Sequence, residues 1–580
     1  MDHLKTVLEQ QVDKILKKVT SNPVQPDITH STQVQFGHYQ CNNALKLAKE
    51  LKKSPRDVAQ MMVMKWKELL EETPDMIASL EIAGPGFINI TFTPSFLSQQ
   101  LMQMLKEPFL GIARPEHQER VIVEFSSPNV AKELHVGHLR STIIGDSLAR
   151  LFEFLGHDVL RLNHIGDWGT QFGMLIAYIK KEQLFQKEEE FDLSQLMQWY
   201  KLSKKLFDED PLFKKTAQLE VVKLQREEQE EVALWKRICD ISRKGFELIY
   251  TLLDIAIIER GESFYNPYLA SVVKDLEDKG MITLSGAAKC IYLEGYEGRE
   301  GEPFPIIIQK SDGGYNYDTT DMAAICHRIR EEKADRIIIV TDSGQSLHFE
   351  MIFKAAEKAS YLDRTKVRVD HVPFGVVLGK DGKKFKTRSG ETEKLIDLIQ
   401  EAINQAKALL QERFLTLSSQ ELQEMATILG INSLKYADLS SHRIKDYTFS
   451  YERMLRFEGN TAPFLLYAYV RIRSIQRKIS RSISEVMKEG MVTLEHPSEI
   501  ELALHLRQFG ETLESMAEEL LPNRLTDYLY TLAEKFHAFF RDCRVEGSSQ
   551  ETSRLLVCEL TALVLKQGLT ILGLKPLEKM

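Results

Sequence analysis

The alternation of hydrophobic and polar positions changes its period twice between residues 120 and 169. Residues 120–125 (RVIVEF) are a short run rich in β-branched side chains, which predicts a buried strand. Residues 137–156 carry leucine and isoleucine at helical spacing and end on a glycine, which predicts a helix that stops there. Residues 157–169 return to a strand-like run with a glycine-bearing turn. This order predicts the beginning of a doubly wound α/β fold of the Rossmann type.

The same patterns divide the rest of the chain. Apolar runs typical of parallel strands return at 303–309, 334–342 and 367–379. Residues from about 180 to 300 are rich in charge at helical spacing, which predicts a solvated helical insertion. After about residue 430 the pattern is almost wholly that of amphipathic bundle helices.

The first segment mixes helices with a strand pair around the Gly-Pro-Gly turn in residues 81–94, and a polar, proline-containing linker follows at 106–120. A chain of 580 residues is also too long for one ordinary core. We therefore expect an N-terminal α+β domain (1–112), a Rossmann-type domain with the helical insertion (113–430) and an all-α bundle (431–580).

Composition narrows the class of protein. No run approaches the roughly 20 apolar residues of a membrane span, and the N-terminus lacks the apolar core of a secretory signal. The cysteines are scattered without a CxxC pair, so we expect a reducing, cytoplasmic location. The net charge of −9 argues mildly against a dedicated nucleic-acid-binding protein. Basic stretches at 379–390 and 467–481 still allow a basic face, although a solvated helix face explains the second equally well.

The motif HVGH (135–138) stands where the first strand of the Rossmann pattern gives way to its helix. As a metal pair it is weak, because zinc needs three or four ligands and no third one is spaced nearby. As a phosphate site it fits, because the helix N-terminus presents free N–H groups and Gly137 lets a ligand approach the backbone. His135 and His138 can then donate to phosphate oxygens, and Lys132 adds a positive charge.

A glycine-bracketed basic loop lies at 379–390 and contains Lys384. A mobile basic loop suits the charge that builds on a pyrophosphate leaving group. The alternative is an ordinary solvated loop. The position of residues 379–390 directly after a hydrophobic strand makes that alternative weaker.

Acidic residues form the third group. Glu124 ends the first strand of the Rossmann pattern, and Asp321 lies four residues after Tyr317. If these positions meet at one crevice, their carboxylates suit an ammonium or, better, the planar donors of a guanidinium. Taken singly, each acid is more simply explained as a helix cap or a structural salt bridge.

These motifs resemble those of class I aminoacyl-tRNA synthetases, whose HIGH and KMSKS motifs correspond to HVGH (135–138) and KFKTR (384–388). The stretches VEFSSPNVAKELHVGHLRST, ERGESFYN, KSDGGYNYDTTDMAA and DSGQSLHF are closer still to the arginyl-tRNA synthetase family. So is the C-terminal run from KYADLSSHRIKDYTFS through GNTAPFLLYAYVRIRSI. The resemblance covers nearly the whole chain and implies a Rossmann-type (HUP-like) catalytic domain.

The resemblance assigns roles by position. It implies that arginine is held by Glu124, Asn129, Tyr317, Asp321 and Gln345. It implies an ATP site formed by His135, Gly137, His138, His348 and Lys384, with catalysis assigned to Lys132, His135, Gly137, His138 and Lys384. The second lysine of KMSKS is replaced by Thr387, which puts the loop's contribution in doubt, and Lys132 stands where a compensating lysine is found in the family.

The resemblance further implies ligation of L-arginine to tRNA(Arg) through an arginyl-adenylate, with ATP and Mg²⁺ as substrate and no tightly bound cofactor or protein-held metal. The family pattern implies an N-terminal module at the tRNA elbow, an anticodon-binding bundle and a monomer. Tyr447 and Tyr528 are candidates to stack on unpaired bases, with core packing as the alternative for each.

Two rival functions stay open at this stage. Other class I ligases have similar architecture, but cysteinyl and methionyl enzymes usually carry zinc ligands that are absent here, and a glutamyl enzyme needs cations in the amino-acid pocket. A tRNA-binding scaffold without catalysis predicts a broken HIGH-like motif or missing carboxylates, but in this sequence the motif and the carboxylates are both intact.

Overall fold

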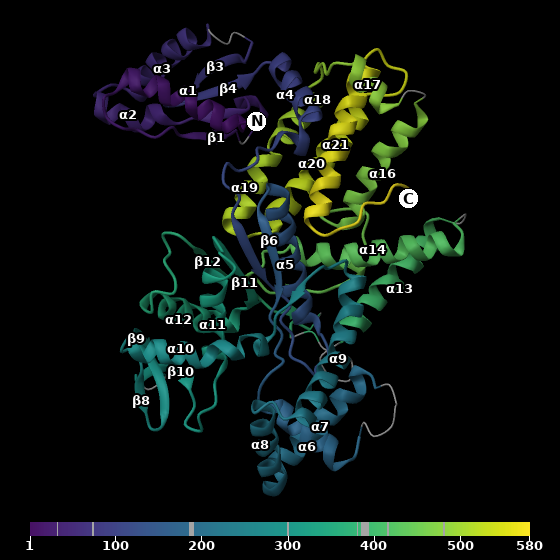
Figure 1. Cartoon of the computed structure of the whole chain (residues 1–580). Helices are drawn as coiled ribbons and strands as arrows, with labels where there is room; N and C mark the ends of the chain where they lie inside the picture. Colours follow the sequence, from purple (N-terminus) through teal and green to yellow (C-terminus); the bar gives the residue numbers. More distant parts are fainter. Residues whose placement is uncertain are drawn as a thin grey trace.

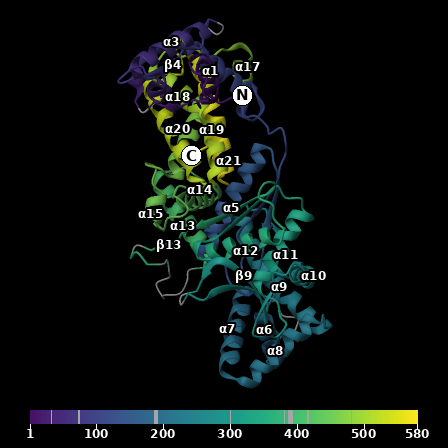
Figure 2. The ribbon, with the colours of Figure 1, turned by 90° about the vertical axis from the view of Figure 1, so that its left-hand side faces the viewer.

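The computed structural model describes residues 1–31, 33–71, 75–184, 191–298, 301–379, 381–383, 385, 394–414, 417–479 and 482–580. The molecule is elongated: the N-terminal part and the C-terminal bundle lie side by side at one end, a parallel sheet lies in the middle, and a helical lobe forms the other end (Figures 1 and 2). Within the described ranges, no helix combines the length and apolar content that crossing a membrane requires.

The N-terminal part is an antiparallel sheet in the order β1-β2-β4-β3 covered by helices. Its elements are α1 (Leu4–Val19), β1 (Ile28–His30), η1 (Val34–Phe36), β2 (Tyr39–Cys41), α2 (Asn43–Leu51), α3 (Pro55–Leu70), β3 (Ile77–Ala83), β4 (Phe87–Phe92), α4 (Pro94–Lys106) and η2 (Pro108–Gly111). The predicted strand pair is the β3–β4 hairpin, in which Ala83 faces Phe87 across the turn.

The central sheet is parallel and runs in the order β12-β11-β5-β6-β7. Its strands are β5 (Arg120–Glu124), β6 (Asp158–Asn163), β7 (Ile258–Glu259), β11 (Arg336–Asp342) and β12 (Arg368–Phe374). Numbered along the chain and read from the β7 edge, this order is 3-2-1-4-5, so the winding reverses between β5 and β11. The crevice outside the carboxyl ends of these two strands is where a doubly wound sheet binds its ligand. The predicted Rossmann-type fold is confirmed.

Helices cover both faces of this sheet. The helix α5 (Val136–Leu155) follows β5, and its buried face joins one apolar core with α1 and the C-terminal bundle. The helices α10 (Asn266–Asp278), α11 (Tyr317–Arg330) and α12 (Ser346–Lys358) contribute to a second core on the other face; η3 (Glu262–Tyr265) directly precedes α10 and η4 (Ser343–Gln345) directly precedes α12.

The predicted helical insertion is only partly correct. Helices α6 (Thr170–Lys181), α7 (Leu193–Glu209), α8 (Pro211–Gln225) and α9 (Gln229–Leu252) form the lobe at the lower end of Figure 1. The range 180–300 also contains β7 of the central sheet, which sequence analysis missed because this strand has only two residues, and both are exposed.

The apolar run at 303–309 is likewise not a strand of the parallel sheet. It forms β10 (Pro303–Gln309) in an antiparallel sheet ordered β10-β9-β8, with β9 (Ala288–Glu297) and β8 (Thr283–Ser285). From Pro305 on, its side chains alternate between half-buried and buried positions, as in a sheet with one more accessible face. A short apolar run by itself does not distinguish the two kinds of sheet.

The C-terminal region is helical, as predicted. It contains α13 (Leu395–Arg413), α14 (Ser419–Leu439), α15 (Tyr451–Met454), α16 (Ala462–Lys478), α17 (Ile483–Glu489), α18 (Pro497–Arg507), α19 (Phe509–Glu519), α20 (Asn523–Asp542) and α21 (Glu551–Ile571). A short parallel pair, β13 (Val377–Leu378) and β14 (Tyr447–Thr448), ties it to the end of the α/β region. The expected boundary at residue 430 lies inside α14, a helix that packs on both α13 and α16.

Candidate active site

A cavity of about 1080 Å³ opens at the carboxyl ends of β5 and β11, at the reversal point of the sheet. Most of the site residues expected from the sequence line it: Glu124, Asn129, His135, Gly137, His138, Tyr317, Asp321, Gln345 and His348. They come from β5, the following loop, α5, α11, η4 and α12, so the tertiary structure brings together residues that are far apart in the sequence. The position of each is a finding, while the role of each remains a prediction.

The loop from β5 to α5 has a strained backbone. Ser126, Ser127 and Ala131 have φ angles of 70°, 47° and 62°, in the left-handed region that non-glycine residues rarely adopt. Side chains of other elements hold this conformation by accepting from the three backbone N–H groups: Ser141 Oγ at 2.9 Å, Asn163 Oδ1 at 3.0 Å and Ser242 Oγ at 3.0 Å, respectively. The loop is therefore set before any ligand arrives.

Asn129 is held at the cavity by the backbone of Gly166. The two residues form a parallel β-bridge, in which Val130 N donates to Gly166 O at 3.1 Å and Gly166 N donates to Pro128 O at 2.9 Å. A Cβ atom at Gly166 would lie 2.1 Å from Asn129 Oδ1. Sequence analysis noted a glycine-bearing turn here but missed that this glycine makes room for a site residue.

The HVGH motif is also the N-terminal cap of α5. His135 Nδ1 accepts from Gly137 N at 3.1 Å, and His138 Nδ1 accepts from His135 N at 3.1 Å, which together form a capping box. Because each Nδ1 accepts, the proton of each neutral ring lies on Nε2. The two rings lie side by side, with centroids 4.0 Å apart. A Cβ at Gly137 would lie 2.9 Å from His135 Cε1, so the glycine also makes room for this ring.

Both histidines of the motif are neutral at physiological pH. Burial, with the charges of His135 and Lys132 nearby, lowers the pKa of His138 to about 3. Burial and Lys132 also lower the pKa of His135. The motif therefore offers two Nε2–H donors at a helix N-terminus, where the helix dipole favours an anion.

The predicted lysines are not part of the described cavity wall. Lys132 is exposed, with its Nζ 5.9 Å from the ring centroid of Tyr200, and it acts on the histidine pair through its charge. Lys384 lies outside the described residues. Its neighbour Phe385 does line the cavity and packs edge-on against Phe449, at 5.2 Å between centroids.

Glu124 lines the cavity and already forms an ion pair with Arg328. Arg328 Nη2 lies 2.6 Å from Glu124 Oε2, and the two side chains are 2% and 7% exposed. Burial lowers the pKa of Arg328, but the charges of Glu124 and Tyr265 and their hydrogen bonds outweigh it, and the net pKa is raised. Sequence analysis missed Arg328, which lies among other basic residues at the end of α11 without a distinguishing signal.

Asp321 is paired with His348. His348 Nε2 lies 2.6 Å from Asp321 Oδ2, and His348 Nδ1 lies 3.3 Å from Asp318 Oδ1. The exposed ring of Tyr317 lies 5.7 Å from the His348 ring, measured between centroids. His348, expected at the ATP site, thus lies directly against the acid that was predicted to bind arginine.

Glu262 is a cavity residue that sequence analysis did not single out. It begins η3, in the stretch RGESFYN after β7. Burial, with the charges of Asp321 and Asp167, raises the pKa of Glu262 to about 8. Its raised pKa marks a crowded acidic wall, where a cation is strongly favoured.

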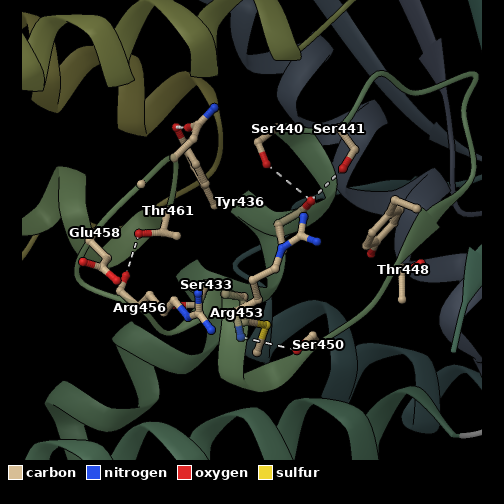
Figure 3. A pocket seen from close by; sticks show the side chains of 15 residues that line it. Ser433, Tyr436, Ser440, Ser441, Thr448, Ser450, Arg453, Arg456, Glu458 and Thr461 are labelled. Atoms are coloured by element: carbon tan, nitrogen blue, oxygen red, sulfur yellow. Dashed lines mark hydrogen bonds between the residues drawn. The ribbon is translucent and has the colours of Figure 1, made fainter. Parts of the chain in front are cut away.

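A second cavity of about 590 Å³ lies where α14 ends, and Tyr447 lines it (Figure 3). Arg453, Arg456 and several hydroxyl groups share this wall. The hydroxyls shown in Figure 3 are partly used by the backbone: Ser440 and Ser441 donate to Ala437 O, and Thr461 donates to Arg456 O. The Tyr447 ring is half-buried, and Arg140 Cζ lies 5.1 Å from its centroid. Its contact with tRNA stays a prediction.

The prediction that Tyr528 stacks on a base is wrong. Its side chain is 5% exposed and stacks on His505, with centroids 4.4 Å apart. Its hydroxyl donates to His505 O at 3.0 Å. The ring therefore belongs to the bundle core, because an amphipathic helix buries the aromatic residues of its apolar face.

Three family profiles match successive parts of the chain. They are the arginyl tRNA synthetase N terminal domain at residues 2–92, the catalytic domain of tRNA synthetases class I (R) at 100–451, and the DALR anticodon binding domain at 465–580.

Individual proteins match over nearly the full length. An arginine–tRNA ligase of Protochlamydia amoebophila is 62% identical over 558 residues, which cover 96% of this chain and 95% of that protein. One of Chlamydia caviae is 51% identical over 555 residues, with 96% and 95% covered. The crystal structure of the Plasmodium falciparum arginyl-tRNA synthetase superposes with a TM-score of 0.87 at 35% identity, covering 100% of both chains.

The structure of the Thermus thermophilus arginyl-tRNA synthetase has a TM-score of 0.79 at 23% identity over 100% of both chains, which shows a shared fold. The catalytic profile spans more than half of the chain, and the bacterial relatives cover almost all of it. The family predicted from the motifs is confirmed: the chain belongs to the arginyl-tRNA synthetases of class I.

Proposed function

We propose that this chain ligates L-arginine to its cognate tRNA at the expense of ATP. In the first step a carboxylate oxygen of arginine attacks the α-phosphorus of ATP, and pyrophosphate leaves. In the second step the terminal adenosine hydroxyl of the tRNA attacks the carbonyl carbon of arginyl-adenylate, and AMP leaves. The observation that carries the proposal is the cavity at the sheet reversal, which joins the histidine pair at the N-terminus of α5 to an acidic wall.

The phosphate side of the cavity supplies donors whose positions are set before ATP binds. The Nε2–H groups of His135 and His138 are available because their Nδ1 atoms are used in the helix cap. Such donors stabilise the charge that develops during transfer without reorganisation. We propose that Lys132 and Lys384 add positive charge there, Lys384 from the basic loop. Gly137 provides the space that the His135 ring needs.

The acidic side suits the guanidinium of arginine. We propose that Asp321 is its main partner, with Glu124 nearby, and that Asn129, Tyr317 and Gln345 position the substrate. A neutral analogue would leave buried polar groups unpaired, a penalty on the order of 10⁴-fold in comparable sites. Discrimination of this size makes a separate editing step unnecessary.

The wider assignments follow the family. We propose that Mg²⁺ enters as part of the MgATP substrate, and that the chain acts as a cytoplasmic monomer. We propose a division into a tRNA-elbow module (1–112), a catalytic domain (113–430) and an anticodon-binding bundle (431–580), with α14 common to the last two. Tyr447, beside two arginines of the second cavity, is the proposed tRNA contact.

The test is charging of unfractionated tRNA with radiolabelled arginine, lysine or glutamate. Wild-type protein should charge arginine alone, and Asp321→Ala should lose this activity by several orders of magnitude. Asp278→Ala, which removes an exposed carboxylate at the end of α10, is the matched control and should charge normally. Charging that survives Asp321→Ala would overturn the pocket assignment. Binding of tRNA without charging of any amino acid would favour a scaffold.

A further inference from the structure

His348 lies in the cavity as a cation between two carboxylates. Its Nε2 is 2.6 Å from Asp321 Oδ2 and its Nδ1 is 3.3 Å from Asp318 Oδ1. A carboxylate accepts hydrogen bonds, so a ring with a carboxylate at each nitrogen carries a proton on both. Burial alone would lower the pKa of His348, but the hydrogen bonds and charges of the two aspartates outweigh it and raise the pKa to about 9.

Among the described residues, none of the other charged groups around His348 forms an ion pair with it in place of the two aspartates. Glu262 of η3 acts on Asp321 and adds to the acidic wall, as Asp342 does at the end of β11. His371 of β12, on the other side of Phe349, is neutral because burial, together with Arg443, lowers its pKa to about 4. Arg140, a buried cation that lines the cavity, is paired with Asp438, and Arg328, a buried cation outside the lining, is paired with Glu124.

Asp318 and Asp321 differ in how firmly they are held. Asp318 Oδ2 accepts from Ile307 N at 3.0 Å and from Asn316 Nδ2 at 3.3 Å, so Asp318 has partners besides the histidine. Asp321 is tied to His348 by a bond of 2.6 Å and faces the cavity. Of the two acids, Asp321 is the one that an entering cation can take over.

We propose that His348 is a positioning and specificity-determining residue of the amino-acid site: it holds Asp321 as an internal cation, and the substrate guanidinium displaces it with release of one proton. This inference rests on the proposed function, because it takes arginine as the ligand of Asp321. The guanidinium keeps its charge at any physiological pH, whereas an imidazolium does not. When both compete for one carboxylate in a half-buried site, the imidazolium therefore loses its proton to solvent and remains as a neutral donor to Asp318.

The displacement explains how the site selects a permanent cation. A neutral ligand such as citrulline leaves the imidazolium on Asp321, so it must bind without the pocket's main acceptor. An ammonium can replace the charge but does not match the fork of planar donors. Because a ligand must displace the imidazolium, this site discriminates against neutral ligands more strongly than an acidic pocket without an internal cation would.

The test is calorimetric titration of the full-length chain with L-arginine, with and without tRNA, in two buffers of different ionisation enthalpy at pH 6.5–8. Wild-type protein should release about 0.9 proton on binding near pH 7.5, and its affinity should rise by up to about tenfold per pH unit. His348→Gln should lose both effects. His371→Gln, which replaces the neighbouring neutral histidine, should retain them.

Binding by wild type without proton release would overturn the inference, as would unchanged release from His348→Gln. The wild-type measurement decides the question even if the variant fails to fold. The proposed function fails in a different way: the wild-type chain would then neither bind arginine at any pH nor charge tRNA. Arginine's own α-amino group contributes equally in all variants, so the difference between variants isolates His348.

Discussion

The absence of a side chain at Gly166 decides where Asn129 points. A Cβ atom built there lies 2.1 Å from Asn129 Oδ1, a distance at which one of the two must move. Asn129 is an exposed residue that lines the cavity. The position of this cavity-lining amide thus depends on the absence of a methyl group in a neighbouring turn.

We predict that Gly166→Ala lowers kcat/KM for arginine by about tenfold or more, because a shift of about 1 Å in a positioning group can reduce the rate on the order of 10²-fold. Steady-state charging kinetics would measure it. If the glycine acts through the amide, the double variant Gly166→Ala/Asn129→Ala should be no worse than Asn129→Ala alone. Additive losses would show instead that the alanine disturbs the loop as a whole.

The first turn of α5 gives each histidine of the HVGH motif a structural function and leaves one ring nitrogen for the proposed catalytic one. Each Nδ1 accepts a backbone N–H group and so caps the helix, and each Nε2–H remains for a ligand. A cap formed by asparagine would satisfy the same backbone group without reaching as far into the cavity. The structural and the proposed catalytic function can therefore be separated by substitution.

We predict that His135→Asn and His135→Ala both slow tRNA-dependent ATP–pyrophosphate exchange by about 10²–10³-fold, the loss typical of removing one preorganised donor. Only the alanine variant should also lower the free energy of unfolding, by about 1 kcal/mol, because it alone lacks a cap. Urea denaturation followed by circular dichroism would measure this difference. Full activity in His135→Asn would mean that the ring serves as a cap and nothing more.

The pair of Arg328 and Glu124 joins α11 to β5 beneath the cavity. We predict that Arg328→Met lowers the free energy of unfolding by about 3–5 kcal/mol, because it leaves a carboxylate buried without a partner. Chemical denaturation would show it. Adding Glu124→Gln to this variant should restore part of the loss, and failure to do so would indicate that the arginine stabilises the fold through packing alone.

At the scale of the molecule, α14 links the lower lobe to the C-terminal bundle through a buried lysine. Lys435 is 1% exposed and donates to Leu253 O at the end of α9 and, at 2.7 Å, to Gly573 O after α21. Burial lowers the pKa of Lys435 to about 8, although Asp146 nearby partly opposes it. Its ordinary value in an unfolded chain is roughly 10.4.

We predict that the free energy of unfolding rises between about pH 8 and 10.4, relative to Lys435→Met. In this range the unfolded chain binds a proton that the folded chain does not, and stability then increases with pH. Urea unfolding of both proteins across the range would measure the difference, since other titrating groups contribute equally. A flat difference would show that this lysine keeps its charge inside the fold.

Local features were predictable because they depend on residues close in the chain. The β-branched run of β5, the helical spacing of α5 and the final Gly156 each act within a few residues. The strand pair in 81–94 was predictable for the same reason. The strand at 303–309 was assigned to the wrong sheet, since the partner of a strand is not encoded in its own apolar pattern.

The sequence by itself determined the family, the Rossmann-type fold and the helical C-terminal region, and most of the site residues predicted from it line the cavity. Only the tertiary structure decided which of these residues already have a partner within the protein or are buried in its core. Arg328 meets Glu124, His348 meets Asp321, and Tyr528 turns into the core. The physical reason is that pairing, burial and pKa depend on distances between residues remote in the chain, and these distances exist only once the fold has formed.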